Sequence, residues 1–238
     1  MRARRLSELV ELMQPAAVEV VGDDTVIGPD VVLDNRAATP GSLFVAIPGS
    51  RVDGHSFAPQ AVAAGAAAVL GNFVTEADVP HILVEDTVQG LSWLARGLVR
   101  EERARGMVSF GVTGSSGKTS TKDIVHTILE LAGDTVAPPG SFNNEIGHPY
   151  TALRCTEATK YLVSEMSARS IGNIAHLAAI APPHIGVVLN VGTAHMGEFG
   201  SRDNIAQAKG ELVEALPADG IAVLNADDDY VAAMADRT

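Results

Sequence analysis

The stretch from Met107 to Lys122 constrains the fold of this chain more than any other. It reads MVSFGVTGSSGKTSTK, and apolar residues at helical spacing follow it. The order is therefore strand, glycine-bearing loop, helix. Such a loop can turn its N–H groups toward phosphate oxygens, and the start of the helix adds partial positive charge. The sequence predicts a nucleotide site at this loop.

Two side chains of the loop suit a nucleotide bound with magnesium. Lys118 can reach the terminal phosphates, and the Thr119 hydroxyl can hold Mg²⁺. The pattern G-x-x-x-x-G-K-[ST] is not met strictly, because residue 112 is Val112. The alternative is a glycine turn with a surface lysine. The predicted cofactor contacts are Gly114, Ser115, Ser116, Gly117, Lys118, Thr119 and Ser120.

Composition narrows the class of protein. The 238 residues are 46% hydrophobic, enough for one large or two ordinary domains, and the formal net charge of -12 argues against a nucleic-acid partner. The single cysteine, Cys155, excludes an internal disulfide and a cysteine-built metal site. Glu8 and Glu11 interrupt any signal-peptide core, and no apolar run approaches the ~18 residues of a membrane span. We expect a cytoplasmic protein without membrane insertion.

The residues before the loop predict an α/β domain. Residues 6–14 have helical spacing, and β-type runs occur at 18–21, 31–33, 43–47 and 82–84. The segment AVAAGAAAVL predicts a helix end that turns at Gly65 into a buried strand, and a helix starts near Thr87. The charged segment REERARG at 100–106 is the expected boundary, which gives domains 1–105 and 106–238.

Strands and helices also alternate after the loop. Strands are expected at 135–137, 161–165, 185–190 and 221–224, with a helix through Ile171, Ile174 and Leu177 and another capped by Ser201. Residues 138–149 are too rich in turn formers for either element. This alternation predicts a mostly parallel sheet with ligands at the carboxyl ends of its strands.

A few residues could do chemistry at those strand ends. Glu165 is a candidate Mg²⁺ ligand, although an exposed carboxylate is equally consistent with the sequence. His195 follows the next strand and could complete a metal shell or contact a phosphate. From the sequence we expect Lys209 to be a solvated lysine and the run at 227–229 to be solvated carboxylates. We expect Cys155 to be a core residue.

Taken together, these segments resemble the Mur ligase family. The resemblance rests on TGSSGKTSTK (113–122), SFNNEIGHP (141–149), SEMSA (164–168), NVGTAHMGEFGS (190–201), AKGEL (208–212) and LNADDD (224–229), in that order. Upstream, DNRAATPGSLFVAIPGSRVDGHSF (34–57) looks like the family's UDP-binding first domain. The family's phosphate loop has the same irregular glycine spacing. The closest resemblance is to the branch that adds D-alanyl-D-alanine to UDP-N-acetylmuramoyl-tripeptide.

The resemblance implies roles for individual residues. Lys118 and Thr119 would hold ATP phosphates and Mg²⁺, and Lys209 matches a lysine that is carbamylated to bridge a second Mg²⁺. Glu165 and His195 would be metal ligands, and Lys118, Lys209 and His195 the catalytic residues. Asn143 and Asn144 match a loop that contacts substrate, and Asn35 and Arg36 stand where the family usually has Ser-Arg near the uridine.

The implied reaction is ATP-dependent amide formation through an acyl phosphate. The family continues past Asp229 with the rest of the ATPase domain and a third domain, so the resemblance predicts an incomplete ATPase domain and a fragment that is inactive alone. Two alternatives stay open. One is another Mur ligase or a folate-polyglutamate type ligase, and the other is a non-catalytic module that binds a nucleotide.

Overall fold

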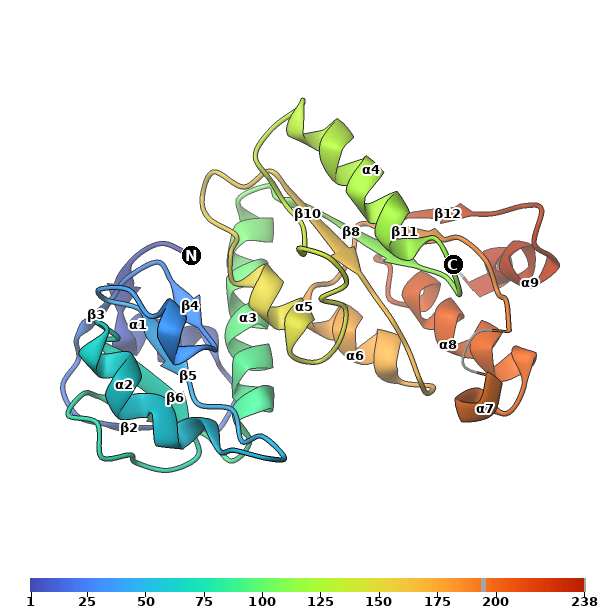
Figure 1. Cartoon of the computed structure of the whole chain (residues 1–238). Helices are drawn as coiled ribbons and strands as arrows, with labels where there is room; N and C mark the ends of the chain where they lie inside the picture. Colours follow the sequence, from blue (N-terminus) through green and yellow to red (C-terminus); the bar gives the residue numbers. More distant parts are fainter. Residues whose placement is uncertain (194–195, 238) are drawn as a thin grey trace. The chain divides into compact units, whose positions relative to one another are not determined.

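The computed structural model describes residues 1–193 and 196–237, and its internal contacts group the chain into a first unit, Met1–Leu98, and a second unit, Val99–Thr238 (Figure 1). The division lies seven residues before the boundary expected from the sequence. Within the described residues, no helix is both long and apolar enough to cross a membrane.

The first unit is built on a five-stranded sheet in the order β2-β7-β6-β5-β4. Its four strands β7, β6, β5 and β4 are parallel, and the edge strand β2 runs antiparallel to β7. The elements are β1 (Arg4–Arg5), α1 (Leu6–Leu12), β2 (Glu19–Val21), β3 (Val26–Ile27), β4 (Val31–Val32), η1 (Asn35–Ala37), β5 (Leu43–Val45), η2 (Gly54–Phe57), α2 (Ala58–Ala63), β6 (Ala68–Gly71), β7 (His81–Leu83) and α3 (Thr87–Ala104).

Small residues allow close packing in this unit. Ala58 and Ala61 of α2 pack with Phe44 and Val69 of the sheet in one buried cluster. Between α1 and α3 the approach is closer still, since a Cβ on Gly97 would lie 2.0 Å from the carbonyl oxygen of Leu12. Only glycine fits there.

The second unit has a five-stranded, wholly parallel sheet in the order β12-β11-β8-β10-β9. Helix α4 covers one face, and α5, α6 and α8 cover the other (Figure 1). Its elements are β8 (Val108–Thr113), α4 (Lys118–Glu130), β9 (Thr135–Val136), α5 (Gly147–Ala152), β10 (Tyr161–Glu165), α6 (Asn173–Ile180), β11 (Ile185–Val188), α7 (Met196–Phe199), α8 (Arg202–Glu214), β12 (Ile221–Leu224), α9 (Asp229–Ala232) and η3 (Ala233–Arg237). The predicted α/β fold with mostly parallel sheets is confirmed.

Two local predictions were wrong. The segment expected to be irregular up to residue 149 already contains the start of α5, because the Asn144 side chain accepts the backbone N–H of Gly147 at 2.8 Å and Pro149 is tolerated in a first helical turn. The helix expected through Ile171 starts later, at Asn173, so Ile171 precedes α6 and is 46% exposed. The helix predicted after the phosphate loop is present as α4, which exposes Ile124 and Ile128.

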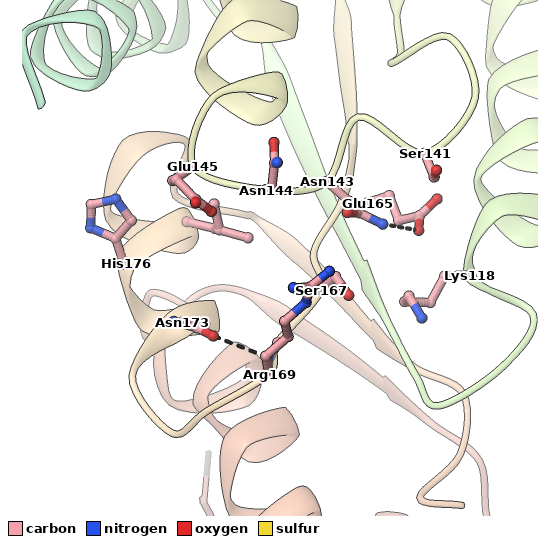
Figure 2. A pocket seen from close by; sticks show the side chains of 12 residues that line it. Lys118, Ser141, Asn143, Asn144, Glu145, Glu165, Ser167, Arg169, Asn173 and His176 are labelled. Carbon is pink, nitrogen blue, oxygen red and sulfur yellow. Dashed lines mark hydrogen bonds between the residues drawn. The ribbon is translucent and has the colours of Figure 1, made fainter. Parts of the chain in front are cut away.

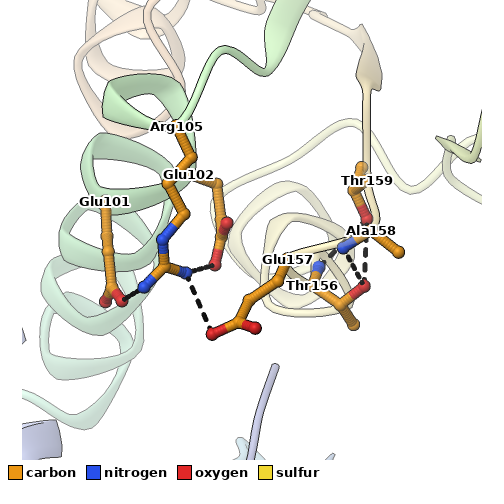
Figure 3. A network of polar contacts seen from close by, with 7 residues as sticks. All are labelled: Glu101, Glu102, Arg105, Thr156, Glu157, Ala158 and Thr159. Carbon is orange, nitrogen blue, oxygen red and sulfur yellow. Dashed lines mark hydrogen bonds and ion pairs between the residues drawn. The ribbon is translucent and has the colours of Figure 1, made fainter.

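The charged segment after residue 100 is helical rather than a linker, because α3 continues to Ala104. Arg105, just beyond the helix, pairs with Glu101 at 2.7 Å, with Glu102 at 2.9 Å and with Glu157 at 3.5 Å (Figure 3). Glu102 is buried, so its charge needs such a partner. These ion pairs tie the end of α3 to the loop before β10.

Candidate active site

The phosphate-type loop leaves the carboxyl end of β8, the central strand of the second unit's sheet. Gly117 of this loop has a φ of 81°, a conformation that favours glycine, and the loop continues into the first turn of α4, which starts at Lys118. The Lys118 ammonium donates to the Gly114 carbonyl at 2.9 Å, and Ser120 is exposed in the first turn of α4. The strand, loop and helix predicted from the sequence are confirmed.

A second loop, after β11, organises the first. The Asn190 side-chain oxygen accepts the backbone N–H groups of Ser115 and Ser116, each at 3.0 Å. In return, the Ser115 hydroxyl accepts the N–H of Gly192 at 2.9 Å. Sequence reasoning did not single out Asn190, because a contact between residues 75 positions apart leaves no local signal.

Glu165 lies next to this loop, at the end of β10, where it pairs in register with Val112. Its carboxylate is buried and accepts the Thr119 hydroxyl at 2.9 Å and the Asn143 amide at 2.6 Å. The alternative interpretation of Glu165 as an exposed carboxylate at a strand end is therefore excluded. A hydroxyl and a carboxylate at this distance are oxygen donors of the kind that Mg²⁺ prefers.

His195, the other predicted metal ligand, lies outside the described residues. Within residues 1–193 and 196–237, no three His, Cys, Asp or Glu side chains gather closely enough to form a metal cluster by themselves. The oxygen pair of Thr119 and Glu165 fits a Mg²⁺ ion that takes its remaining ligands from phosphate and water.

Lys209 is a buried side chain on α8, so its interpretation as a solvated lysine is wrong. Burial, together with the nearby charge of Lys118, lowers the Lys209 pKa from 10.5 to about 8. An amine with this pKa is partly neutral near pH 8 and is then nucleophilic.

A cavity of about 800 Å³ extends from the phosphate loop across the end of β10 (Figure 2). Of the predicted nucleotide contacts only Lys118 lines it, and its other walls come from the loop at 141–145, the end of β10 and α6. Asn143 and Asn144 both line the cavity, although the Asn144 side-chain oxygen is engaged at the start of α5. The lining residues that sequence reasoning missed include Glu145, Arg169, Asn173 and His176.

In the first unit, Asn35 and Arg36 lie on η1 and line a separate cavity of about 590 Å³. Arg36 pairs with Asp34 at 2.6 Å, and this guanidinium lowers the pKa of the Asp34 carboxyl to about 2. Phe44 and Phe57 form part of the same lining. Phe44 is buried, so the arrangement offers a ligand the exposed ring of Phe57 and a guanidinium that already pairs with Asp34.

The remaining candidates have structural roles. Asp228 caps α9 and also accepts the backbone N–H of Val191 at 2.9 Å, so it stabilises the loop after β11. Cys155 is fully buried, and burial raises the pKa of its thiol to about 12, as suits a core residue.

Comparison with known proteins agrees with this architecture. The Mur ligase middle domain matches residues 112–238, and a second description, Mur ligase family, catalytic domain, matches residues 30–98. The UDP-N-acetylmuramoyl-tripeptide--D-alanyl-D-alanine ligase of Mycobacterium leprae is 49% identical over 97% of this chain and 51% of its own length.

Two solved structures show the same arrangement of elements. One is the UDP-N-acetylmuramoylalanyl-D-glutamyl-2,6-diaminopimelate--D-alanyl-D-alanyl ligase of Acinetobacter baumannii, with a TM-score of 0.87, 30% identity, and coverage of 100% of this chain and 52% of that one. The other is the MurF ligase of Thermotoga maritima in complex with ADP, with a TM-score of 0.73, 39% identity, and coverage of 83% and 46%.

The chain spans about half the length of the curated relatives it matches. The family match includes the phosphate loop from residue 114 onward, the Glu165 strand end and the α8 helix of Lys209, which are the parts of the site described above. The chain belongs to the Mur ligase family.

Proposed function

We propose that this chain carries the nucleotide and acyl-substrate sites of an ATP-dependent ligase that adds D-alanyl-D-alanine to UDP-N-acetylmuramoyl-tripeptide. The observation that supports this most strongly is the phosphate loop whose Thr119 hydroxyl bonds Glu165 at 2.9 Å, beside a cavity large enough for a peptide. The names of the relatives supply the substrates. The first unit would bind the UDP-linked end of the substrate at Asn35 and Arg36, and the second unit would bind ATP.

The resemblance to the Mur ligases implies the chemistry. The peptide carboxylate attacks the γ-phosphorus of ATP, ADP leaves, and the resulting acyl phosphate is attacked by the amine of D-alanyl-D-alanine with release of phosphate. Lys118 would hold the phosphates that carry the developing charge. Mg²⁺, held by Thr119, Glu165 and His195, would supply further charge neutralisation when bound. Asn143 and Asn144 would hold the substrate within reach of the phosphate.

We also propose that Lys209 becomes a carbamate. Its lowered pKa favours the neutral amine, which can attack carbon dioxide with loss of one proton. The product is an oxygen-donor anion suited to a second Mg²⁺. In buffer with ¹³C-labelled bicarbonate we expect a carbamate resonance that is lost in Lys209→Arg, and a wild-type spectrum without that resonance would contradict the modification.

Titration of the chain with ADP and Mg²⁺ tests the nucleotide site. We expect Lys118→Ala to weaken binding at least about a hundredfold, because hydrogen bonds to charged groups are worth about 1.5–3 kcal/mol and the phosphates offer several. The control is Lys160→Ala, an exposed lysine of the same unit. Equal affinities for wild type and Lys118→Ala would contradict the proposed nucleotide site.

A further inference from the structure

Arg169 is a cation in the cavity of the second unit that the described residues do not neutralise. The side chain is exposed and lines the cavity, and Figure 2 shows it reaching from the loop after β10 toward the centre. The whole chain has 29 acidic residues, yet within the described part none of them pairs with the Arg169 guanidinium. An unpaired guanidinium facing a cavity is free to bind an anion from solution.

The backbone beneath Arg169 is held firmly in place. The Asn173 side-chain oxygen accepts the N–H groups of Arg169 and Ser170, each at 3.0 Å. The buried Glu211 carboxylate accepts the N–H of Gly172 at 2.5 Å and that of Ala175 at 2.9 Å. These bonds connect the loop to α8, the helix that carries Lys209. The guanidinium therefore has a fixed base and free donors, which is the arrangement of a binding residue.

The position of Arg169 favours a peptide anion over a nucleotide phosphate. Lys118 is the only phosphate-loop residue in the cavity lining, and the other walls near Arg169 come from Ser167, Asn173 and His176. Glu145 lines the same cavity, so a ligand with an ammonium as well as a carboxylate meets a partner for each charge. Arginine binds a carboxylate through two parallel N–H donors, which fixes its orientation.

We propose that Arg169 binds a carboxylate of the peptide part of the acyl substrate, an assignment that rests on the function proposed above. The peptide of a D-glutamyl-2,6-diaminopimelate substrate carries carboxylates beyond the one that reacts. Two sources are therefore available: a carboxylate common to all such tripeptides, or the distal carboxylate that diaminopimelate has and lysine lacks.

Calorimetric titration of the full chain tests the assignment. The ligands are UDP-N-acetylmuramate, its tripeptide with diaminopimelate, its tripeptide with lysine, and ADP with Mg²⁺. We expect Arg169→Gln to weaken tripeptide binding about ten- to a hundredfold, as for loss of a charge-assisted pair, while the affinities for UDP-N-acetylmuramate and ADP stay unchanged. Arg169→Lys keeps the positive charge but not the two parallel N–H donors, so it should lose less tripeptide affinity than Arg169→Gln. The matched control is Arg100→Gln, which removes an exposed arginine of the same unit that does not line this cavity.

The pattern of affinity losses tests the assignment and distinguishes the two carboxylates. Equal losses for both tripeptides support a shared carboxylate, and a loss for the diaminopimelate form alone supports the distal one. Unchanged tripeptide affinity in Arg169→Gln, or an equal loss of ADP affinity, would overturn the assignment while leaving the proposed function in place. Absence of tripeptide binding by the wild-type chain would overturn both.

Discussion

The buried imidazoles of the first unit, His55 and His81, differ in their partners from three of the charged side chains that the second unit buries, Glu165, Lys209 and Glu211. The rings of His55 and His81 are fully used by the first unit. His55 contacts Asp53 at 2.6 Å through Nδ1 and accepts the N–H of Asn72 at 3.1 Å through Nε2. A buried ring with both nitrogens engaged stabilises a fold and has no donor or acceptor left for a ligand.

The buried charges of the second unit differ among themselves. Glu211 is satisfied by two backbone donors, and Glu165 by a hydroxyl and an amide. Lys209, in contrast, has no hydrogen-bond partner for its ammonium within the described residues, and its pKa is lowered to about 8. Burying such a cation costs stability, which a protein tolerates where the group has a chemical task. Lys209 therefore differs from the hydrogen-bonded carboxylates of the same unit.

Among the buried polar groups compared above, the largest expected effect is on the stability of the second unit in Lys209→Met. The pKa falls from 10.5 to about 8 on folding, so the buried ammonium costs about 3 kcal/mol at pH 7 at most, and a Met of similar length removes that cost. The folded pKa is depressed. The stability contribution is therefore present above pH 10.5 and lost as the pH falls toward 8, so the advantage of Lys209→Met should grow as the pH falls across this window and stay constant below it.

The difference in unfolding free energy between wild type and Lys209→Met is measured by urea denaturation, with hydrogen exchange of the β8 amides as the readout, in buffer depleted of carbon dioxide. Lys160→Met is the control, because Lys160 is exposed and its removal should change little. A second unit that is less stable in Lys209→Met at pH 7 would show that the ammonium is compensated and that the contrast between the units is smaller than described.

A smaller effect is expected in the first unit for His55→Ala. The change leaves the Asn72 N–H without its acceptor and removes the ring that stacks on Phe73 at 4.1 Å, so we expect a loss of about 2 kcal/mol. Trp93, the only tryptophan, lies in the first unit and reports its unfolding by fluorescence. ADP affinity should not change. A fall in ADP affinity without a loss of stability would assign His55 to a site instead.

The sequence predicted the parts of the site that depend on local order. The loop from Gly114 to Lys118, the end of a strand at Glu165, and the Ser201 cap, whose hydroxyl accepts the Asn204 N–H at 3.1 Å, all follow from patterns of a few residues. Strand and helix periods also predicted the α/β fold with parallel sheets, because alternation of the two leaves few other arrangements.

What the sequence could not predict depends on contacts between distant segments. Asn190 binds the phosphate loop from the neighbouring strand, and Glu211 holds the start of α6 from another helix, so neither has a local pattern. Lys209 shows the same limit, since its burial comes from the packing of α8 and a lysine is usually exposed. Periodicity also gives the width of an apolar stripe but not the side of the helix that the core will cover.

Helix α4 shows this last point, and it provides the smallest expected effect. Ile128 is 60% exposed, whereas Lys122 on the same helix is 2% exposed and its ammonium donates to the Pro138 carbonyl at 2.8 Å. Leu94 of α3 is fully buried. We expect Ile128→Ser to change the stability of the second unit by less than about 0.5 kcal/mol, and Leu94→Ala to cost the first unit about 3 kcal/mol. The measurement is urea denaturation at several protein concentrations. A loss of about 2 kcal/mol or more in Ile128→Ser is the size of a large single-mutant effect. If that loss depended on protein concentration, it would show that another copy covers the α4 surface in solution. The apolar spacing of this helix would then mark an interface instead of an uncovered face.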